Sequence, residues 1–464
     1  MTVANARDFK RTSDLQQTHV AAFRRRFSGS LVLTGDDDYN SARRVWNGMI
    51  DKRPAIIAYC AKPSDVVESI AFARETGVPI AVRAGGHNIA GKSLCENGLV
   101  IDLSRMRRVA IDPQSRTARA EGGALLADLD VASQAHGLAT TTGVNSDTGL
   151  VGLTLGGGIG RLGRKHGLSC DNMLSAEVVT ADGRILKASE DDNADLFWAV
   201  RGGGGNFGVV TEVVYRLHPL GPKVLAGSLI YRWRDARAAL RLYAGFSAGA
   251  PEEISVDAAL VTLPDGDRAV SISAFYAGPL EEGERALAPL RSALTPLEDR
   301  ICPIPYVELQ RAGDATFPRG DRFFWKAQFL RTVPDAAIDA LMEIYPAAPS
   351  PRSLFVFQQV GGAIARAPAE QSAYANRDAA YDAFPVSIWT DPAQDEANVA
   401  WVSATYEAMR PFGTNGVYVN NLGDEGEDRV MAAYGANYRR LAALKRKFDP
   451  ENLFRANQNV RPAG

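Results

Sequence analysis

The chain has 464 residues, a net charge of −2 at pH 7 and 46% hydrophobic residues. This length predicts two or three folding units, and the balanced composition excludes a disordered chain and argues against a nucleic-acid partner. No run approaches the roughly 18 to 20 apolar residues of a membrane span. The basic run at 24–26 is not followed by the apolar stretch of a secretory signal. We therefore expect a soluble, cytoplasmic protein that binds neither nucleic acid nor membrane.

The first half of the chain alternates short β-branched runs with helical stretches. Helices are predicted over residues 64–76 and 123–136, and strands over residues 55–59, 79–83, 99–103 and 117–121. Gly137 stands where a C-terminal cap is expected after the second helix. This half therefore has an α/β pattern.

The second half has a different pattern. Strand-like runs interleaved with Ala-rich helices are predicted over residues 229–232, 270–276, 323–329 and 354–360. They indicate a second domain built on a mainly antiparallel sheet. Residues 434–448 predict a basic amphipathic helix, which Asp449 and Pro450 end because proline disfavours a helical conformation in the residue before it.

Two glycine-rich patches indicate close approach of the backbone to a ligand. Residues 83–88, Arg-Ala-Gly-Gly-His-Asn, follow a predicted strand, where free N–H groups can converge on an anion, although a plain structural turn has the same pattern. Residues 143–167 are dense in glycine but lack both the Rossmann spacing and a Walker A lysine. If a nucleotide cofactor binds here, it uses another fold.

Four ordered segments carry a family resemblance. They are RAGGHN (83–88), GLTLGGGIGRLGRKHGLSCDN (152–172), DLFWAVRGGGGNFGVVTEV (195–213) and KRKFDPENLFRANQNV (445–460). Together they resemble the berberine bridge enzyme-like FAD-linked oxidases of the vanillyl-alcohol oxidase, or PCMH-type FAD-binding, superfamily. The resemblance is collinear from about residue 38 to the C-terminus and weakest between about 225 and 400.

The resemblance implies an α+β fold: a two-lobed PCMH-type FAD-binding domain and a substrate domain whose antiparallel sheet is covered by helices. We expect the FAD-binding domain at 1–222, with lobes at about 38–105 and 106–222. The substrate-binding domain is expected at 223–418, and a C-terminal segment at 419–464 is expected to return to the FAD-binding domain.

The resemblance also implies a covalently held FAD. In the family, the histidine of the Gly-Gly-His turn bonds to the flavin 8α-methyl carbon, and some members add a thioether from a cysteine to ring carbon C6. These positions would be His87 and Cys170, whose imidazole and thiolate are suitable nucleophiles. Cys170 also fits a small core residue, which would leave the attachment to His87 alone. The other implied FAD contacts are Arg83, Ala84, Gly85, Gly86, Asn88, Gly143, Gly152, Gly156, Gly157, Gly158, Gly160, Gly208, Val210, Asn457 and Asn459.

The catalytic residues depart from the family pattern. In many relatives a tyrosine after an asparagine removes the substrate's proton, but Asn421 stands there, and an amide is no general base. Strand alternation would place Tyr418 and Asn420 on one face and Asn421 on the other. Tyr418, Asn421 and Gln359 are the candidates; one of Gln358 and Gln359 must face the flavin if their strand roofs the cavity. The widely spaced cysteines indicate no metal site.

The predicted function is that of an FAD-dependent oxidase, which takes a hydride to flavin N5 and passes the electrons to dioxygen, giving hydrogen peroxide. The missing tyrosine favours substrates that need little help to lose a proton, such as a phenol, polyketide, alkaloid or amine of secondary metabolism, over a simple sugar alcohol. The alternatives are a dehydrogenase of the same fold with another acceptor, a flavin-binding protein without turnover, and a nucleotide-binding module without flavin.

Overall fold

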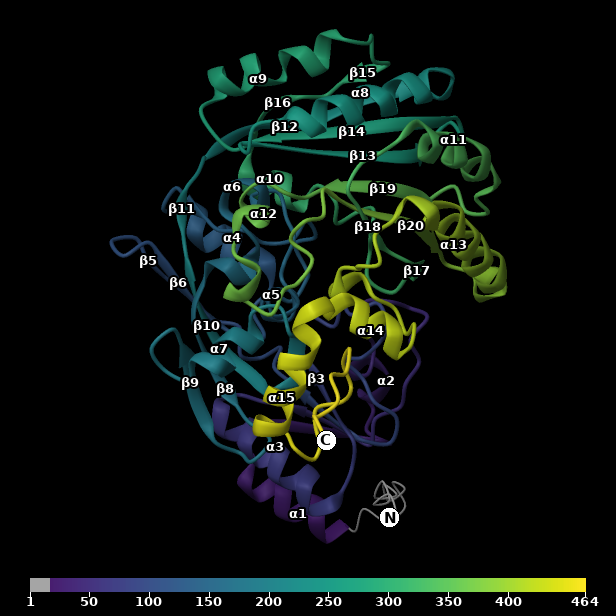
Figure 1. Ribbon diagram of the computed structural model, residues 1–464. Helices are drawn as coiled ribbons and strands as arrows, with labels where there is room; N and C mark the ends of the chain where they lie inside the picture. Colours follow the sequence, from purple (N-terminus) through teal and green to yellow (C-terminus); the bar gives the residue numbers. More distant parts are fainter. Residues whose placement is uncertain (1–16) are drawn as a thin grey trace.

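A four-stranded sheet lies at the lower end of the molecule in Figure 1, a computed structural model that describes residues 17–464. Its strand order is β1-β2-β4-β3. Strand β4 is parallel to both of its neighbours, β2 and β3, whereas β1 is antiparallel to β2. The elements are β1 (Ser30–Leu33), β2 (Ile56–Tyr59), β3 (Ile80–Arg83), β4 (Leu99–Asp102), α1 (Gln17–Arg26), α2 (Tyr39–Ala42) and α3 (Pro63–Thr76). Each predicted element in this region is present.

A second, antiparallel sheet follows, with the order β5-β6-β10-β8-β9. Its strands are β5 (Val109–Asp112), β6 (Thr117–Glu121), β8 (Met173–Val179), β9 (Ile185–Ser189) and β10 (Val209–Arg216), and a small pair is formed by β7 (Leu138–Ala139) and β11 (His218–Pro219). The helices are α4 (Leu126–Gln134), α5 (Leu150–Leu155), α6 (Gly163–His166) and α7 (Ala194–Val200). Helix α4 begins later than predicted because the Asp128 carboxylate accepts the Leu125 N–H at its first turn.

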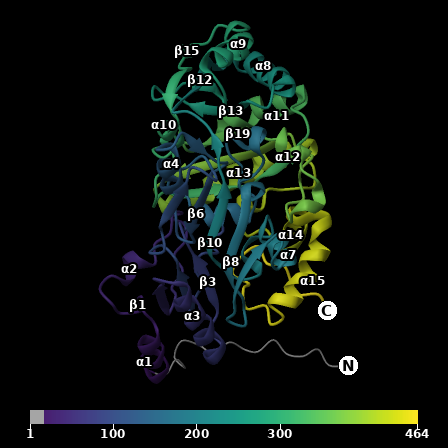
Figure 2. The ribbon, with the colours of Figure 1, turned by 90° about the vertical axis from the view of Figure 1, so that its left-hand side faces the viewer.

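A nine-stranded sheet, the roof sheet, lies in the upper half of the molecule (Figures 1 and 2). Along the order β15-β12-β14-β13-β19-β20-β17, its strands are β15 (Glu298–Asp299), β12 (Lys223–Arg232), β14 (Arg268–Tyr276), β13 (Ile254–Thr262), β19 (Leu354–Gln359), β20 (Tyr381–Trp389) and β17 (Arg322–Trp325). The remaining two, β16 (Cys302–Pro305) and β18 (Gln328–Leu330), pair with β12 and β20. Every pairing is antiparallel, as predicted, but the expected strand at 323–329 is two strands, β17 and β18.

Helices cover one face of the roof sheet and leave the other to a cavity. The covering helices are α8 (Ala236–Gly249), α9 (Leu280–Ser292), α11 (Asp335–Ile344) and α13 (Asp395–Met409). On β13, Val256, Ala258 and Leu260 pack in the core beneath these helices, whereas Ser255 and Asp257 line the cavity. The alternation of side chains along each strand therefore divides the sheet into an apolar and a site-facing surface.

The C-terminal segment returns to the lower part of the molecule, coloured yellow in Figure 1. The predicted helix at 434–448 is present as α15 (Tyr438–Phe448), which begins four residues later than expected because Gly435, with a φ of 48°, separates it from the preceding helix α14 (Glu427–Tyr434). The remaining short helices are α10 (Tyr306–Arg311) and α12 (Ala363–Arg366). The division of the chain into domains at 1–222, 223–418 and 419–464 stays a prediction. Among residues 17–464, no helix is long and apolar enough to cross a membrane.

A buried ion pair fastens this returning segment. Lys445 Nζ lies 2.7 Å from Asp449 Oδ2, and both side chains are 0% exposed. The ammonium also donates to the carbonyls of Asn206 and Phe454, at 2.8 and 2.7 Å, and the carboxylate accepts the N–H groups of Leu453 and Phe454. Both charges are thus fully hydrogen-bonded, and the C-terminal segment is joined to the loop before β10.

We expect Lys445→Met to lower the free energy of unfolding by about 3 to 5 kcal/mol, because it leaves a buried carboxylate without its counter-charge. Denaturant titration followed by circular dichroism measures this. The matched control is Lys447→Met on the same helix, whose exposed pair with Asp195 is worth less than about 1 kcal/mol. Equal losses in the two variants would contradict the assignment.

Candidate cofactor and substrate cavity

A cavity of about 700 Å³ lies between the roof sheet and the two lower sheets. Segments far apart in the chain form its walls: residues 80–88, 143–161, 204–210, 418–421 and 454–458, together with the cavity face of the roof sheet. Apolar and backbone groups make up most of the lining, with a few polar side chains among them. This is the usual character of a cofactor or substrate site.

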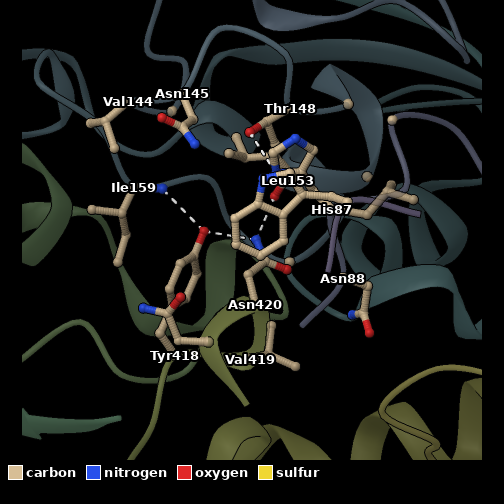
Figure 3. Close-up of a pocket in the computed structure, with 18 of the residues that line it drawn as sticks. His87, Asn88, Val144, Asn145, Thr148, Leu153, Ile159, Tyr418, Val419 and Asn420 are labelled. Carbon is tan, nitrogen blue, oxygen red and sulfur yellow. Dashed lines mark hydrogen bonds between the residues drawn. The ribbon is translucent and has the colours of Figure 1, made fainter. Parts of the chain in front are cut away.

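His87 projects into this cavity from the turn after β3 (Figure 3). Its ring stacks on Trp46, with 4.8 Å between ring centroids and 21° between planes. Nε2 lies 2.7 Å from Asp147 Oδ1, and Nδ1 lies 3.5 Å from the Thr148 hydroxyl. Burial lowers the pKa of His87 even though Asp147 opposes the shift, so the imidazole is neutral at neutral pH. A neutral imidazole has one nitrogen lone pair free to act as a nucleophile.

Asp147 determines which ring nitrogen of His87 carries the free lone pair. Its pKa is held below the ordinary value by His87 and Arg319, which outweigh the effect of burial, so it is a carboxylate. Its negative charge, 2.7 Å from Nε2, favours the tautomer with the proton on Nε2 and the lone pair on Nδ1, although the two groups are not aligned for a hydrogen bond in the described residues. Arg319 reaches Asp147 at 3.3 Å and also donates to the Gly85 carbonyl at 2.9 Å. Neither Asp147 nor Arg319 was indicated by the sequence.

Two glycine contacts set the shape of the cavity wall. A Cβ on Gly85 would lie 2.3 Å from the backbone nitrogen of Gly149, so only glycine lets the His87 turn touch the start of α5. A Cβ on Gly156 would lie 2.0 Å from the side-chain oxygen of Asn420. These glycines are therefore required by contacts between chain segments as much as by a ligand.

The structure places most of the predicted cofactor residues in the cavity wall. Those that line it are Ala84, Gly85, Gly86, His87, Asn88, Gly143, Gly152, Gly156, Gly208, Val210 and Asn457. Those that do not are Arg83, Gly157, Gly158, Gly160, Cys170 and Asn459. Arg83 forms a buried ion pair with Asp102 instead, and a Cβ on Gly157, Gly158 or Gly160 would collide with Tyr374, Ser169 or Thr142.

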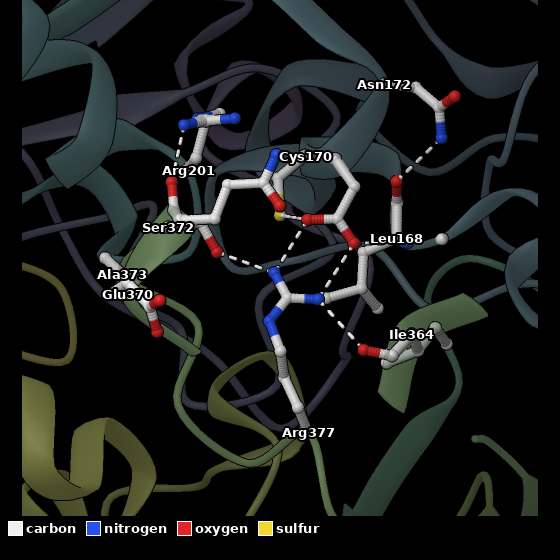
Figure 4. A network of polar contacts seen from close by, with 12 residues as sticks. Leu168, Cys170, Asn172, Arg201, Ile364, Glu370, Ser372, Ala373 and Arg377 are labelled. Atoms are coloured by element: carbon white, nitrogen blue, oxygen red, sulfur yellow. Dashed lines mark hydrogen bonds and ion pairs between the residues drawn. The ribbon is translucent and has the colours of Figure 1, made fainter. Parts of the chain in front are cut away.

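The prediction of a flavin bond at Cys170 is corrected by the position of this residue. Cys170 is 0% exposed and packs among Leu168, Phe329 and Tyr374, outside the cavity lining. Figure 4 shows it near Arg377, which forms an ion pair with Asp171. Burial raises the pKa of its thiol well above the ordinary value, so it is not a thiolate. Cys170 is therefore a core residue, which was the other interpretation of the sequence.

The segment with the catalytic candidates is not a strand. Val419–Asn421 forms a 3-10 turn, so the predicted division of faces is wrong, and Tyr418, Asn420 and Asn421 all line the cavity. The Tyr418 hydroxyl oxygen accepts three N–H groups: those of Gly158 at 3.0 Å, Ile159 at 3.2 Å and the Asn420 amide at 2.8 Å (Figure 3). Tyr418 is thus fixed against residues 143–161, which form the glycine-rich wall of the cavity. Burial raises the pKa of Tyr418 to about 12.

A carboxyl group that the sequence did not indicate stands beside Asn421. The Asn421 amide donates to Asp382 Oδ2 at 2.6 Å. Asp382 is 0% exposed, and burial raises its pKa to about 7. Its other oxygen, Oδ1, has no hydrogen-bond partner among the described residues. Asp382 can therefore hold a proton near neutral pH next to the position where many relatives have a tyrosine.

The prediction that Gln359 contacts the substrate is also incorrect. Its side chain accepts the Val256 N–H at 3.0 Å and donates to the Ser247 carbonyl of α8 at 2.7 Å, so it lies on the helix-covered face. Its neighbour Gln358 lines the cavity. Because side chains alternate along β19, only one residue of this pair can face the cavity, and that residue is Gln358.

The cavity fits an FAD molecule. Asn457 donates to the carbonyls of Gly205 and Phe454, while its buried Oδ1 has no partner among the described residues and can accept a ligand N–H. Gly152 and Gly205 line the cavity, and a Cβ on either would meet no protein atom within 4 Å, which leaves their backbone open to a ligand. A cavity with a neutral histidine, exposed backbone and an unpaired amide is compatible with a bound flavin.

Comparisons with known proteins agree with this interpretation. The family model described as an FAD binding domain matches residues 54–189, and the one described as berberine and berberine like matches residues 417–461. The chain is 32% identical to (R)-6-hydroxynicotine oxidase of Paenarthrobacter nicotinovorans, over 94% of this chain and 97% of that one. It is 31% identical to an FAD-linked oxidoreductase of Dictyostelium discoideum, over 94% and 95%.

Solved structures have the same fold. The crystal structure of 6-hydroxy-D-nicotine oxidase from Arthrobacter nicotinovorans aligns with a TM-score of 0.85 at 28% identity and covers 94% of this chain and 98% of that one. A berberine bridge enzyme variant described as a reticuline dehydrogenase aligns with a TM-score of 0.86 at 21% identity, covering 96% and 99%. The chain belongs to the berberine bridge enzyme-like family of FAD-linked oxidoreductases.

Counting free thiols tests the position of Cys170. The denatured protein with its flavin should show all four thiols of the sequence to a thiol reagent, because none is bonded to the cofactor. In the native protein only the exposed Cys302 should react quickly, and Cys302→Ser should abolish that reaction. Three thiols after denaturation, with the missing one traced to Cys170 by peptide mapping, would restore the second bond.

Proposed function

We propose that the protein is an oxidase that holds FAD through a single covalent bond from His87. It oxidises a small organic molecule and uses dioxygen as the electron acceptor. The observation that carries this proposal is the neutral His87 imidazole in the cavity wall, held between Trp46 and Asp147. The burial of Cys170 outside the cavity supports one bond rather than two.

Bound FAD would supply a hydride acceptor at its N5 atom. The protein's part is to exclude water, to orient the substrate and to hold the proton that the substrate's heteroatom loses. Trp325, Phe384 and Val386 form an apolar wall that limits water. Asn421 lines the same cavity and donates to Asp382, a buried carboxyl that lies behind the lining, and Asp382 Oδ1 is the atom on which we place the proton.

The fold leaves the electron acceptor open, because its solved relatives include a nicotine oxidase and a reticuline dehydrogenase. We favour dioxygen because (R)-6-hydroxynicotine oxidase is similar over nearly the whole chain. Peroxide release in air, compared with reduction of an artificial dye without oxygen, separates the two. We propose a natural-product-like substrate, such as a phenol, polyketide, alkaloid, amine or alcohol, since no tyrosine stands at position 421.

The flavin attachment is tested by precipitating the protein with acid and measuring the flavin fluorescence of the pellet. We expect the parent and Cys170→Ala to retain flavin and His87→Ala to retain none. Asp147→Asn should slow covalent attachment at least about tenfold when the apoprotein is mixed with FAD, because the favoured Nδ1 lone pair is lost. Release of all flavin from the parent would refute the covalent bond and leave only the family assignment.

The role of Asp382 is tested with a substrate found by peroxide release. In the parent, kcat/KM should rise as the pH passes about 7, because the carboxylate form accepts the proton. Asp382→Asn should lower kcat/KM about 100-fold or more and remove this step. Asp378→Asn, which alters an exposed carboxylate nearby, is the control. An unchanged pH profile in Asp382→Asn would assign the proton to another group.

A further inference from the structure

A row of polar side chains crosses the cavity face of the roof sheet. The strand register places Ser228 opposite Ser273, Ser273 opposite Asp257, and Gln358 opposite Asp382. Ala258 pairs with Phe357, which puts Asp257 beside Gln358 in the same register. Residues directly opposite one another point to the same face, so the row runs across β12, β14, β13, β19 and β20.

The hydrogen-bonding capacity of this row is mostly unused. Among the described residues, the side chains of Ser228, Ser273 and Gln358 have no hydrogen bond, although all three line the cavity. Asp257 accepts one hydrogen bond, from the Gln359 N–H at 2.8 Å. Polar groups that line a cavity and are left without protein partners are available to a ligand that can hydrogen-bond to them.

Arg161 faces this row from the glycine-rich wall. Its guanidinium donates one hydrogen bond, to Gln310 Oε1 at 2.9 Å, and has no ion-pair partner within 4 Å in residues 17–464. Gln310 cannot turn away, because its amide nitrogen donates to Thr142 and to the Gly143 carbonyl, at 2.9 and 3.0 Å. Arg161 is thus a positioned cation whose other N–H groups are free for a ligand.

Two other buried arginines, Arg164 and Arg377, differ from Arg161 because their guanidinium groups are hydrogen-bonded within the protein. Arg164 donates to the carbonyls of Ile254, Val360 and Ala250, at 2.7 to 2.9 Å, and Arg377 pairs with Asp171. Each has its partners within the protein. Arg161 alone of these three lines the cavity with most of its donors unpaired.

We propose that Arg161 and Asp257 form a substrate subsite for an acidic oxygen group that stands next to a hydroxyl, as in a hydroxy-substituted carboxylate or a phenol-bearing acid. Arg161 binds the anionic oxygen through paired N–H donors, and the Asp257 carboxylate accepts a hydrogen bond from the hydroxyl group. A simple cationic amine would meet the Arg161 charge and bind weakly. This subsite rests on the proposed function, because it orients the substrate of the same cavity.

The rest of the roof sheet fits the body of such a molecule. Beyond the polar row, the cavity side is formed by apolar side chains, namely Trp325, Leu354, Val356, Phe384 and Val386. One end of the cavity therefore takes a flat apolar body, and the other takes its polar group. The subsite fixes which carbon of the substrate is presented to the cofactor.

Calorimetric titration of the purified protein with salicylate, 2-hydroxybenzyl alcohol and benzylamine tests the subsite. Salicylate has the adjacent carboxylate and hydroxyl, the alcohol lacks the charge, and the amine reverses it. We expect salicylate to bind the parent at least about tenfold more tightly than either of the others. Equal or weaker binding of salicylate would overturn the proposal.

Variants separate the subsite from general electrostatics. Arg161→Gln should weaken salicylate binding about tenfold or more and change that of 2-hydroxybenzyl alcohol less than about twofold, while Arg161→Lys retains part of the affinity. Arg311→Gln, which removes an exposed charge from α10 nearby, should have no effect. Unchanged salicylate binding in Arg161→Gln would overturn the assignment. Failure of the proposed oxidase would instead appear as absent flavin or absent peroxide, which this titration does not measure.

Discussion

The position of His87 is the constraint on which the rest of the site depends. Trp46 stacks on one face of its ring, Asp147 contacts Nε2, and the contact between Gly85 and Gly149 holds its turn against α5. Trp46 in turn stacks on Phe323 of the roof sheet, with 3.9 Å between ring centroids. The roof sheet, the histidine turn and the glycine-rich wall are therefore aligned by one set of contacts, and a shift of any of them moves the imidazole.

Burial determines the chemistry of the titratable groups around the cavity. It lowers the pKa of His87, which keeps the imidazole neutral, and raises the pKa of Asp382 to about 7 and of Asp257 to about 6. The same effect raises the pKa of the Cys170 thiol, because Arg377 and Arg201 offset only part of the cost of burial. Reactivity here follows from which groups have a charged or polar neighbour in a shielded place, and not from residue type alone.

Much of the fold could be predicted from local sequence, and the site only in part. Strands such as 117–121 and the covering helices follow from periodicity, and the glycine-rich turn at 83–88 indicated His87. Two predictions failed because they required tertiary information. Cys170 lies in a motif that suggested a role, yet its side chain packs away from the cavity, and Gln359 differs from Gln358 only in strand phase. Asp147, Asp382 and Arg161 had no local signal, since their partners are distant in the sequence.

The order in which the chain is made has a consequence for loading of the cofactor. Residues 418–421 and 454–458 form part of the cavity wall, and Lys445 of α15 holds the second of these segments through the Phe454 carbonyl. A growing chain on the ribosome therefore has the histidine turn long before it has a closed site. A chain that stops before residue 455 therefore lacks Ala456, Asn457 and Gln458 of the cavity wall, and with them the unpaired Asn457 oxygen that a ligand can meet.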